Sequence, residues 1–246
     1  MLLLCRCLLV RFAAGLVGGC APRSRLLALR SDARCVSSDA DVEEAAAVFA
    51  AAFFGADAAA AAVRADFDER YGDRGGLRRL PSALFAVGDP AFAVVGAELA
   101  IVDGARVYSN VAGEAWVNDR MGALGGRSRK QLAGLDAFGL VAKLAEPHER
   151  LRVAPVLSNL AVLPTRRRGG LAKQLVVRVE AWCRGVGAPE VLLVVNADNA
   201  AARGLYASCG FEVVEEFPSV ALSTDDAGDL IERPTTDVIM RKRLDA

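Results

Sequence analysis

Arginines and glycines follow directly on an apolar run that ends at Pro164. Arg167, Arg168, Gly169 and Gly170 stand there, and a stretch with helical periodicity begins at the next residue. The first turn of a helix has unpaired N–H groups and a partial positive charge, and glycine lets an anion approach the backbone closely. This spacing predicts a site for a phosphate or pyrophosphate group. A solvated basic turn is the alternative that these residues leave open.

Other phosphate-binding motifs fit the chain poorly. It has no G-x-x-x-x-G-K-S/T sequence, and residues 167–172 do not follow the G-x-G-x-x-G pattern of dinucleotide folds. The formal net charge is zero, with 30 basic and 30 acidic residues, which argues against a nucleic-acid partner. No window offers the roughly 18 uninterrupted apolar residues of a membrane span, so we expect no stable span. The absence of a C-x-x-C pair argues against a zinc site, and we expect no metal.

Two motifs in this part of the chain resemble those of the GNAT acetyltransferases. Residues 167–172, Arg-Arg-Gly-Gly-Leu-Ala, match the Q/R-x-x-G-x-G/A signature of that family. Residues 199–206, followed by Gly210-Phe211, resemble its N-x-x-A-x-x-L-Y-x-x-x-G-F element. The motifs stand at the expected separation with a strand between them. Residues 158–164 also look like the family's splayed fourth strand, and the specific match covers residues 153–217.

The resemblance implies the fold class and the cofactor. The fold would be α/β, the GNAT fold, with a mixed, mostly antiparallel central sheet flanked by helices. The cofactor would be acetyl-CoA, its pantetheine arm held and its thioester carbonyl polarised by backbone groups of residues 160–162. Amides of residues 168–173 would bind the pyrophosphate, and Asn199 would contact the arm. The full implied cofactor-binding set is Leu160, Ala161, Val162, Arg167, Arg168, Gly169, Gly170, Leu171, Ala172, Lys173, Asn199, Ala200, Ala201 and Tyr206.

Tyr206 is the catalytic acid that the resemblance implies, protonating the departing CoA thiolate. A tyrosine hydroxyl, with an ordinary pKa of about 10, is a competent donor to a thiolate of similar basicity. A core tyrosine at a helix end is the alternative reading of this residue.

The sequence offers one candidate for the general base. Many family members place a carboxylate on the fourth strand, where this chain has Ser158 and Asn159. Glu98, on the preceding hairpin, could act through a water molecule, so we take it as the second catalytic candidate. Asn196 cannot act as a base. His148, the one histidine, is expected in a surface loop.

The elements that position these residues follow from apolar periodicity. Helices are expected over 42–53, 58–70, 171–185 and 199–206, and strands over 83–87, 91–102, 153–163, 191–195, 211–217 and 237–244. Asp41 is expected to cap the first helix, with Glu44 three residues later. Residues 105–150 are an expected insertion with one helix over 131–144. Its basic run, 127–130, is expected to be a mobile solvated loop, with an acidic partner or the 3′-phosphate of CoA as alternatives.

The start of the chain predicts a targeting presequence over residues 1–38, ahead of one GNAT domain over 39–246. Acidic residues are absent before Asp32, while arginines recur, as in organelle transit peptides. We expect a plastid location, with a mitochondrion, a secretory route and an uncleaved start as alternatives.

The leader together with the motifs resembles plastid GNAT proteins of plants and algae, which implies acetylation of protein amines. We therefore expect acetyl transfer to a protein N-terminus or lysine. A small amine, such as a polyamine or amino acid, is one alternative acceptor, and a non-catalytic acyl-CoA sensor is another function. The oligomeric state stays open.

Overall fold

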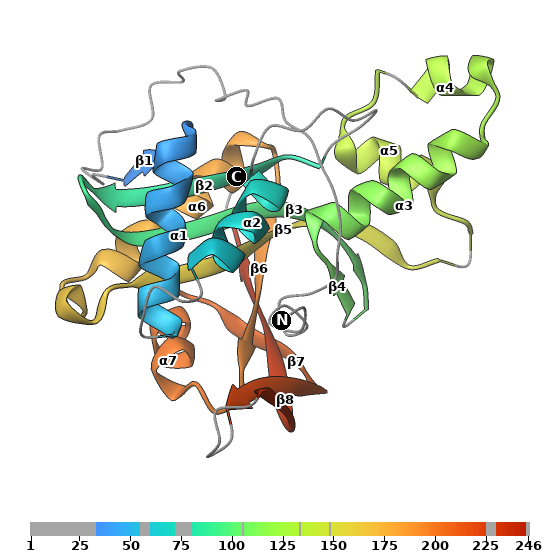
Figure 1. Ribbon diagram of the computed structural model, residues 1–246. Helices are drawn as coiled ribbons and strands as arrows, with labels where there is room; N and C mark the ends of the chain where they lie inside the picture. The colour runs from blue at the N-terminus through green and yellow to red at the C-terminus, as the bar shows by residue number, and fades with distance from the viewer. Residues whose placement is uncertain are drawn as a thin grey trace.

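The computed structural model describes residues 33–54, 60–71, 80–104, 106–132, 134–147, 149–224 and 230–244. Its centre is an eight-stranded sheet with the order β1-β2-β3-β5-β6-β8-β7, in which the short β4 pairs with β3 (Figure 1). Among these strands only β5 and β6 run parallel; the other pairs are antiparallel. The strands are β1 (Ala33–Cys35), β2 (Ser82–Gly88), β3 (Ala91–Asp103), β4 (Arg106–Tyr108), β5 (Leu151–Val162), β6 (Glu190–Asn196), β7 (Glu212–Thr224) and β8 (Leu230–Arg243).

Helices cover both faces of this sheet, with α1 and α2 on one face and α6 and α7 on the other (Figure 1). The helices are α1 (Asp39–Phe53), α2 (Ala60–Tyr71), α3 (Asn110–Ala123), α4 (Gly126–Leu132), α5 (Ala137–Leu144), α6 (Leu171–Gly185) and α7 (Ala200–Ser208). A mixed, mostly antiparallel sheet between helical layers confirms the fold class expected from the sequence, the GNAT fold. In the part of the chain that the structure describes, no helix is both long and apolar enough to span a membrane.

Alternation along the strands divides the core between the two faces. Val94 of β3 packs on the α1–α2 side, in a cluster with Phe49 and Phe67. Its neighbour Val95 points the other way, into a cluster with Leu175 of α6. All five of these side chains have at most 4% of their surface exposed, so both helical layers are anchored on one central strand.

The folded body begins earlier than expected. The strand β1, within the segment that we assigned to a presequence, pairs with β2 from Ala33↔Val87 to Cys35↔Phe85. The cap of α1 is also Ser38 rather than Asp41: the Asp41 amide donates to Ser38 Oγ (3.2 Å), and the Ser38 amide donates to Asp41 Oδ2 (3.3 Å). The expected domain start at residue 39 is therefore too late. Three residues are too few for a strand signal in the sequence.

The insertion holds three helices where we expected one. Val117 of α3 and Leu140 of α5 pack with Leu99 and Ile101 at the far end of β3. The basic run 127–130 lies on the short exposed helix α4 and not in a loop, which corrects that expectation. Because α4 buries no residue, it has no apolar face, and periodicity could not reveal it.

Candidate active site

The turn between β5 and α6 has the geometry of an anion site. Gly170 caps α6 with φ 80°, and Arg168 also has a positive φ, 67°. The first backbone bond of the helix runs from the Gln174 amide to the Gly170 carbonyl (3.2 Å). Within the described residues no group accepts from the amides of 168–173, so this row of donors faces outward. Added Cβ atoms at Gly169 and Gly170 would meet nothing closer than 3.7 Å, which leaves open space in front of them.

The Arg167 side chain shapes this turn. Its guanidinium donates to the carbonyls of Val162 (3.2 Å) and Ala52 (3.2 Å), and so ties the turn to the ends of β5 and α1. Arg168 and Lys173 are the other basic side chains in the expected cofactor set. Arg167 therefore supports the turn through its side chain, and a bound anion would meet the backbone amides.

A gap opens between β5 and β6 beside this turn. The two strands pair only at Val156↔Leu192 and Leu157↔Leu193. Beyond these residues β5 stays with β3 as far as Val162, and β6 stays with β8 as far as Asn196, so they diverge. This is the splayed strand that the sequence predicted.

The backbone of β5 points donors into the gap. The Leu163 amide donates to the Phe92 carbonyl of β3 (3.0 Å). Because amides alternate in direction along a strand, those of Val162 and Leu160 point away from β3, towards the gap. An extended, thiol-bearing arm lying in the gap could accept hydrogen bonds from these two amides, as a neighbouring strand would in a continuous sheet.

A β-bulge lies at the mouth of the gap. The register of β3 and β5 changes between Gly96↔Ser158 and Val94↔Ala161, so that β5 carries one extra residue. Asn159 there has φ 52°, and its Nδ2 donates to the Tyr71 hydroxyl (3.0 Å). That hydroxyl is also 2.9 Å from Ser158 Oγ. The sequence pointed to Ser158 and Asn159 but not to Tyr71, whose partners come from a distant strand.

Glu98 faces the same side of the sheet as Ser158 but is engaged in an ion pair. Its Oε1 lies 3.2 Å from Arg70 NH1, and only 3% of the residue is exposed. Arg70 also binds Asp66, with an Nε–Oδ1 distance of 3.1 Å. Burial by itself would lower the pKa of Arg70, but the Glu98 and Asp66 carboxylates raise it above its usual range. A carboxylate that holds a buried arginine loses that pairing on protonation, which counts against Glu98 as the general base.

Tyr206 lies on α7, in the buried cluster that also contacts Leu160 and Leu171. Its ring packs against Phe211 with centroids 5.8 Å apart. Burial, with a smaller contribution from the nearby Cys209, raises the pKa of Tyr206 to about 12. The hydroxyl therefore keeps its proton at every physiological pH, as a donor must.

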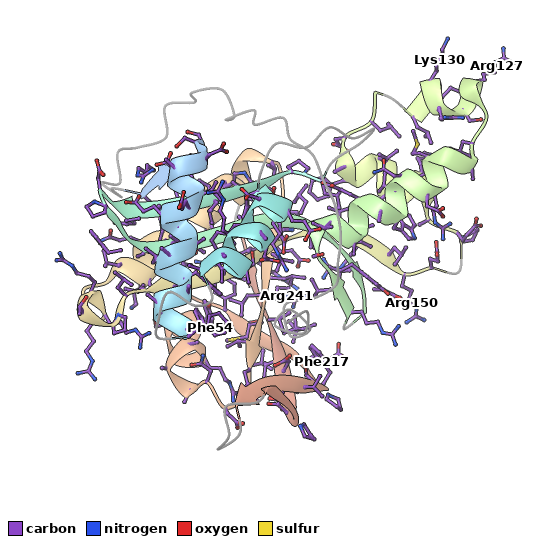
Figure 2. All side chains as sticks on the ribbon, in the orientation of Figure 1. Phe54, Arg127, Lys130, Arg150, Phe217 and Arg241 are labelled. Atoms are coloured by element: carbon purple, nitrogen blue, oxygen red, sulfur yellow. The ribbon has the colours of Figure 1, made fainter. Side chains whose placement is uncertain are left out.

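The remaining predicted residues occupy the turn before α7 and the insertion. Asn199 caps α7, its Oδ1 accepting from the Ala202 amide (3.1 Å). Figure 2 shows Arg127 and Lys130 at the outer tip of α4, across the molecule from the β5–α6 turn. This placement, on a different part of the molecule from the turn, argues against pairing of the basic run with the 3′-phosphate of CoA. His148 lies outside the described residues.

Comparison with known proteins agrees with this geometry. Residues 150–211 match the model of the acetyltransferase (GNAT) family. A search of curated proteins found no match. The segment that holds the gap, the turn and α7 is thus similar to the GNAT acetyltransferases.

Similar solved structures include three N-acetyltransferases. The ribosomal-protein-S18-alanine N-acetyltransferase from Escherichia coli is 14% identical, with 87% of this chain and 94% of that chain covered and a TM-score of 0.48. The ribosomal-protein-alanine N-acetyltransferase from Brucella melitensis is 14% identical, with 86% and 99% covered and a TM-score of 0.47. An N-acetyltransferase from Staphylococcus aureus Mu50 is 14% identical, with 87% and 98% covered and a TM-score of 0.47.

Proposed function

We propose that this chain transfers the acetyl group of acetyl-CoA to an amine of a protein or peptide. The observation that carries the proposal is the gap between β5 and β6, flanked by outward-facing amides of residues 168–173 and by the buried Tyr206. The amides suit a pyrophosphate, the gap suits an extended arm, and the tyrosine suits a leaving thiolate. Together they offer one group for each of the pyrophosphate, the arm and the thiolate of acetyl-CoA.

The reaction forms an N–C bond and breaks the C–S bond of the thioester. The amine attacks the carbonyl, whose developing negative charge would be met by backbone amides of β5, such as that of Leu160. The sulfur leaves with the bonding electrons and takes the proton of Tyr206. The amine loses one proton, and through solvent Tyr206 regains the one that it gave. Holding both reactants in one gap supplies a further part of the acceleration.

Deprotonation of the amine is assigned to water in this proposal. The segment of β5 beside the gap, 158–162, carries no acidic residue, and Glu98 is held by Arg70. The acceptor must therefore reach the site as a neutral amine. An α-amino group has a pKa near 8, whereas a lysine has one of about 10.4, so the pH dependence of the reaction reports the kind of acceptor.

A protein acceptor is favoured by an apolar part of the sheet, on β6, β8 and β7, that the helices α1 and α2 leave uncovered. Val194 of β6 lies in register with Ile239 of β8, on the face of the apolar cluster around Leu192, and it is 40% exposed. Phe217 packs against this cluster from β7, the outermost strand next to β8 (Figure 2). An apolar surface of this kind is better covered by the side chains of a peptide than by a hydrated polyamine.

The test is CoA release from acetyl-CoA by the chain without its first 32 residues. Acceptors would be peptides with a free N-terminus, N-blocked peptides with one lysine, and small amines. We expect turnover with one peptide class; kcat/KM should level off above pH 8 for N-termini and keep rising towards pH 10 for lysines. Preference for a polyamine or free amino acid would contradict the protein acceptor.

A non-catalytic acyl-CoA sensor is the second candidate, because Glu98 is held in its ion pair and β5 offers no other acid beside the gap. Tight acetyl-CoA binding without CoA release on any acceptor would favour this function. Failure to bind acetyl-CoA would exclude both.

We also propose plastid delivery, for which the arginine-rich, acid-poor start is the support. Residues 1–32 fused to a fluorescent protein should direct it to plastids. Accumulation in mitochondria or in the secretory route would contradict this location.

A further inference from the structure

The bulge of β5 holds a conformation that needs an explanation. Asn159 has φ 52°, in the left-handed region that non-glycine residues seldom occupy. Asparagine tolerates this region better than most residues, but the conformation persists only where its surroundings enforce it. The residue that follows is Leu160, whose amide points towards the gap. Any relaxation of the bulge would therefore move that amide.

Tyr71 of α2 is the group that holds the bulge. Its hydroxyl accepts from Asn159 Nδ2 (3.0 Å) and lies 2.9 Å from Ser158 Oγ. A phenol donates one hydrogen bond and accepts others, so it can satisfy both residues at once. The Tyr71 hydroxyl oxygen thus links Asn159, in the bulge, to Ser158, the last residue of β5 before the bulge that is in regular register with β3.

The position of this hydroxyl is fixed on two sides. The Tyr71 ring meets Phe67 edge-on, with centroids 5.6 Å apart and an interplanar angle of 86°. Gly96 of β3 leaves the space that the hydroxyl occupies, since a Cβ atom there would lie 1.9 Å from it. Burial raises the pKa of Tyr71, and the nearby Glu98 raises it further, so the hydroxyl stays neutral and able to donate.

We propose that Tyr71 is a positioning residue for acetyl transfer: through Ser158 and Asn159 it holds the β5 bulge so that the Leu160 amide meets the thioester carbonyl. This inference rests on the proposed function. Tyr71 does not touch the reacting atoms in this scheme. Its contribution appears in kcat, because a displaced amide stabilises the charge that develops in the transition state less well.

The test compares Tyr71→Phe in two backgrounds. The substitution keeps the ring on Phe67 and removes both hydrogen bonds. In the wild-type background we expect kcat to fall about 10-fold, with KM for acetyl-CoA changed less than about two-fold. Asn159→Gly removes the amide partner and lets the backbone take positive φ freely. In that background Tyr71→Phe should lower kcat less than about three-fold. Tyr108→Phe, on β4, is the matched control and should leave kcat unchanged.

Several results would overturn the proposal. An equal loss of kcat in both backgrounds would show that Tyr71 acts independently of Asn159. An unchanged kcat in Tyr71→Phe, or a loss confined to KM, would exclude positioning. A drop in melting temperature that accounts for the lost activity at the assay temperature would reduce Tyr71 to a folding role.

Binding separates this proposal from the proposed function. If the wild-type protein binds acetyl-CoA but acetylates no acceptor, the proposed acetyl transfer is wrong. The positioning role of Tyr71 is then tested by the ratio of the Kd values for CoA and acetyl-CoA. Tyr71→Phe should then reduce the preference for acetyl-CoA about three-fold in calorimetry. An unchanged ratio, or a wild-type protein that does not bind acetyl-CoA, overturns the inference.

Discussion

Replacement of Tyr206 by phenylalanine removes one oxygen atom from the proposed acid and little else. The ring packs against Phe211 at 5.8 Å and lies in the cluster between α7 and the sheet, and phenylalanine retains these contacts. Stability should therefore change by less than about 1 kcal/mol. Any large loss of rate would then come from the hydroxyl itself.

The size of the loss follows from burial. With the pKa of Tyr206 at about 12, about 1% of the hydroxyl is ionised at pH 10, against about half for an ordinary tyrosine. Losing a donor to a charged group costs about 1.5–3 kcal/mol, or roughly 10- to 150-fold in kcat.

The assay is steady-state CoA release between pH 6 and pH 10 with the preferred acceptor. Tyr206→Phe should lower kcat by at least about 10-fold at every pH while KM for acetyl-CoA stays within about two-fold. The wild-type kcat should not fall on approach to pH 10. Tyr108→Phe again serves as the control for a tyrosine outside the gap.

Two results would refute this reasoning. A variant with kcat within two-fold of wild type would leave Tyr206 as a core residue. A wild-type kcat that declines with an apparent pKa near 10, and does so only when Tyr206 is present, would mean that burial does not protect the hydroxyl.

Three further predictions follow from the same contacts. Glu98→Gln should leave the pH dependence of kcat unchanged and lower the free energy of unfolding by about 3 kcal/mol, since Arg70 loses its buried partner. If the variant instead loses one of the pH-dependent changes in kcat that the wild type shows, Glu98 is the general base. Gly170→Ala should lower the free energy of unfolding by about 1 kcal/mol in denaturant titrations, because φ at this residue is 80°. Gly169→Ala should leave stability unchanged and raise KM for acetyl-CoA at least five-fold. Equal effects of the two substitutions would contradict the anion site. Finally, Tyr206 has a folded pKa of about 12 against an ordinary 10, so the protein binds more protons than the unfolded chain in this window and must lose stability as pH rises through it. The loss should be on the order of 2–3 kcal/mol and smaller in Tyr206→Phe; equal slopes in thermal melts across pH 9–12 would disprove it.

The local structure around the candidate site residues could be predicted because it is formed by continuous segments of the chain. The turn from residue 164 to 173 needs a preceding strand, residues that permit positive φ and an apolar helix face, and all three lie within one stretch of chain. The cap at Asn199 and the buried Tyr206 likewise belong to one short helix. Local rules of capping and periodicity act over such distances, which is why strands, helices and motif residues were found from the sequence.

By itself, then, the sequence determined the order of the main elements, the glycine-containing turn before α6 and the location of the tyrosine on α7. Tertiary structure alone decided what surrounds them. Tyr71 meets Ser158 and Asn159 across 87 and 88 residues of sequence, and Glu98 meets Arg70 across 28. Such pairings depend on the register of β3 with β5 and on the seat of α2 on the sheet. Both follow from the packing of the whole core, which no short window of sequence contains.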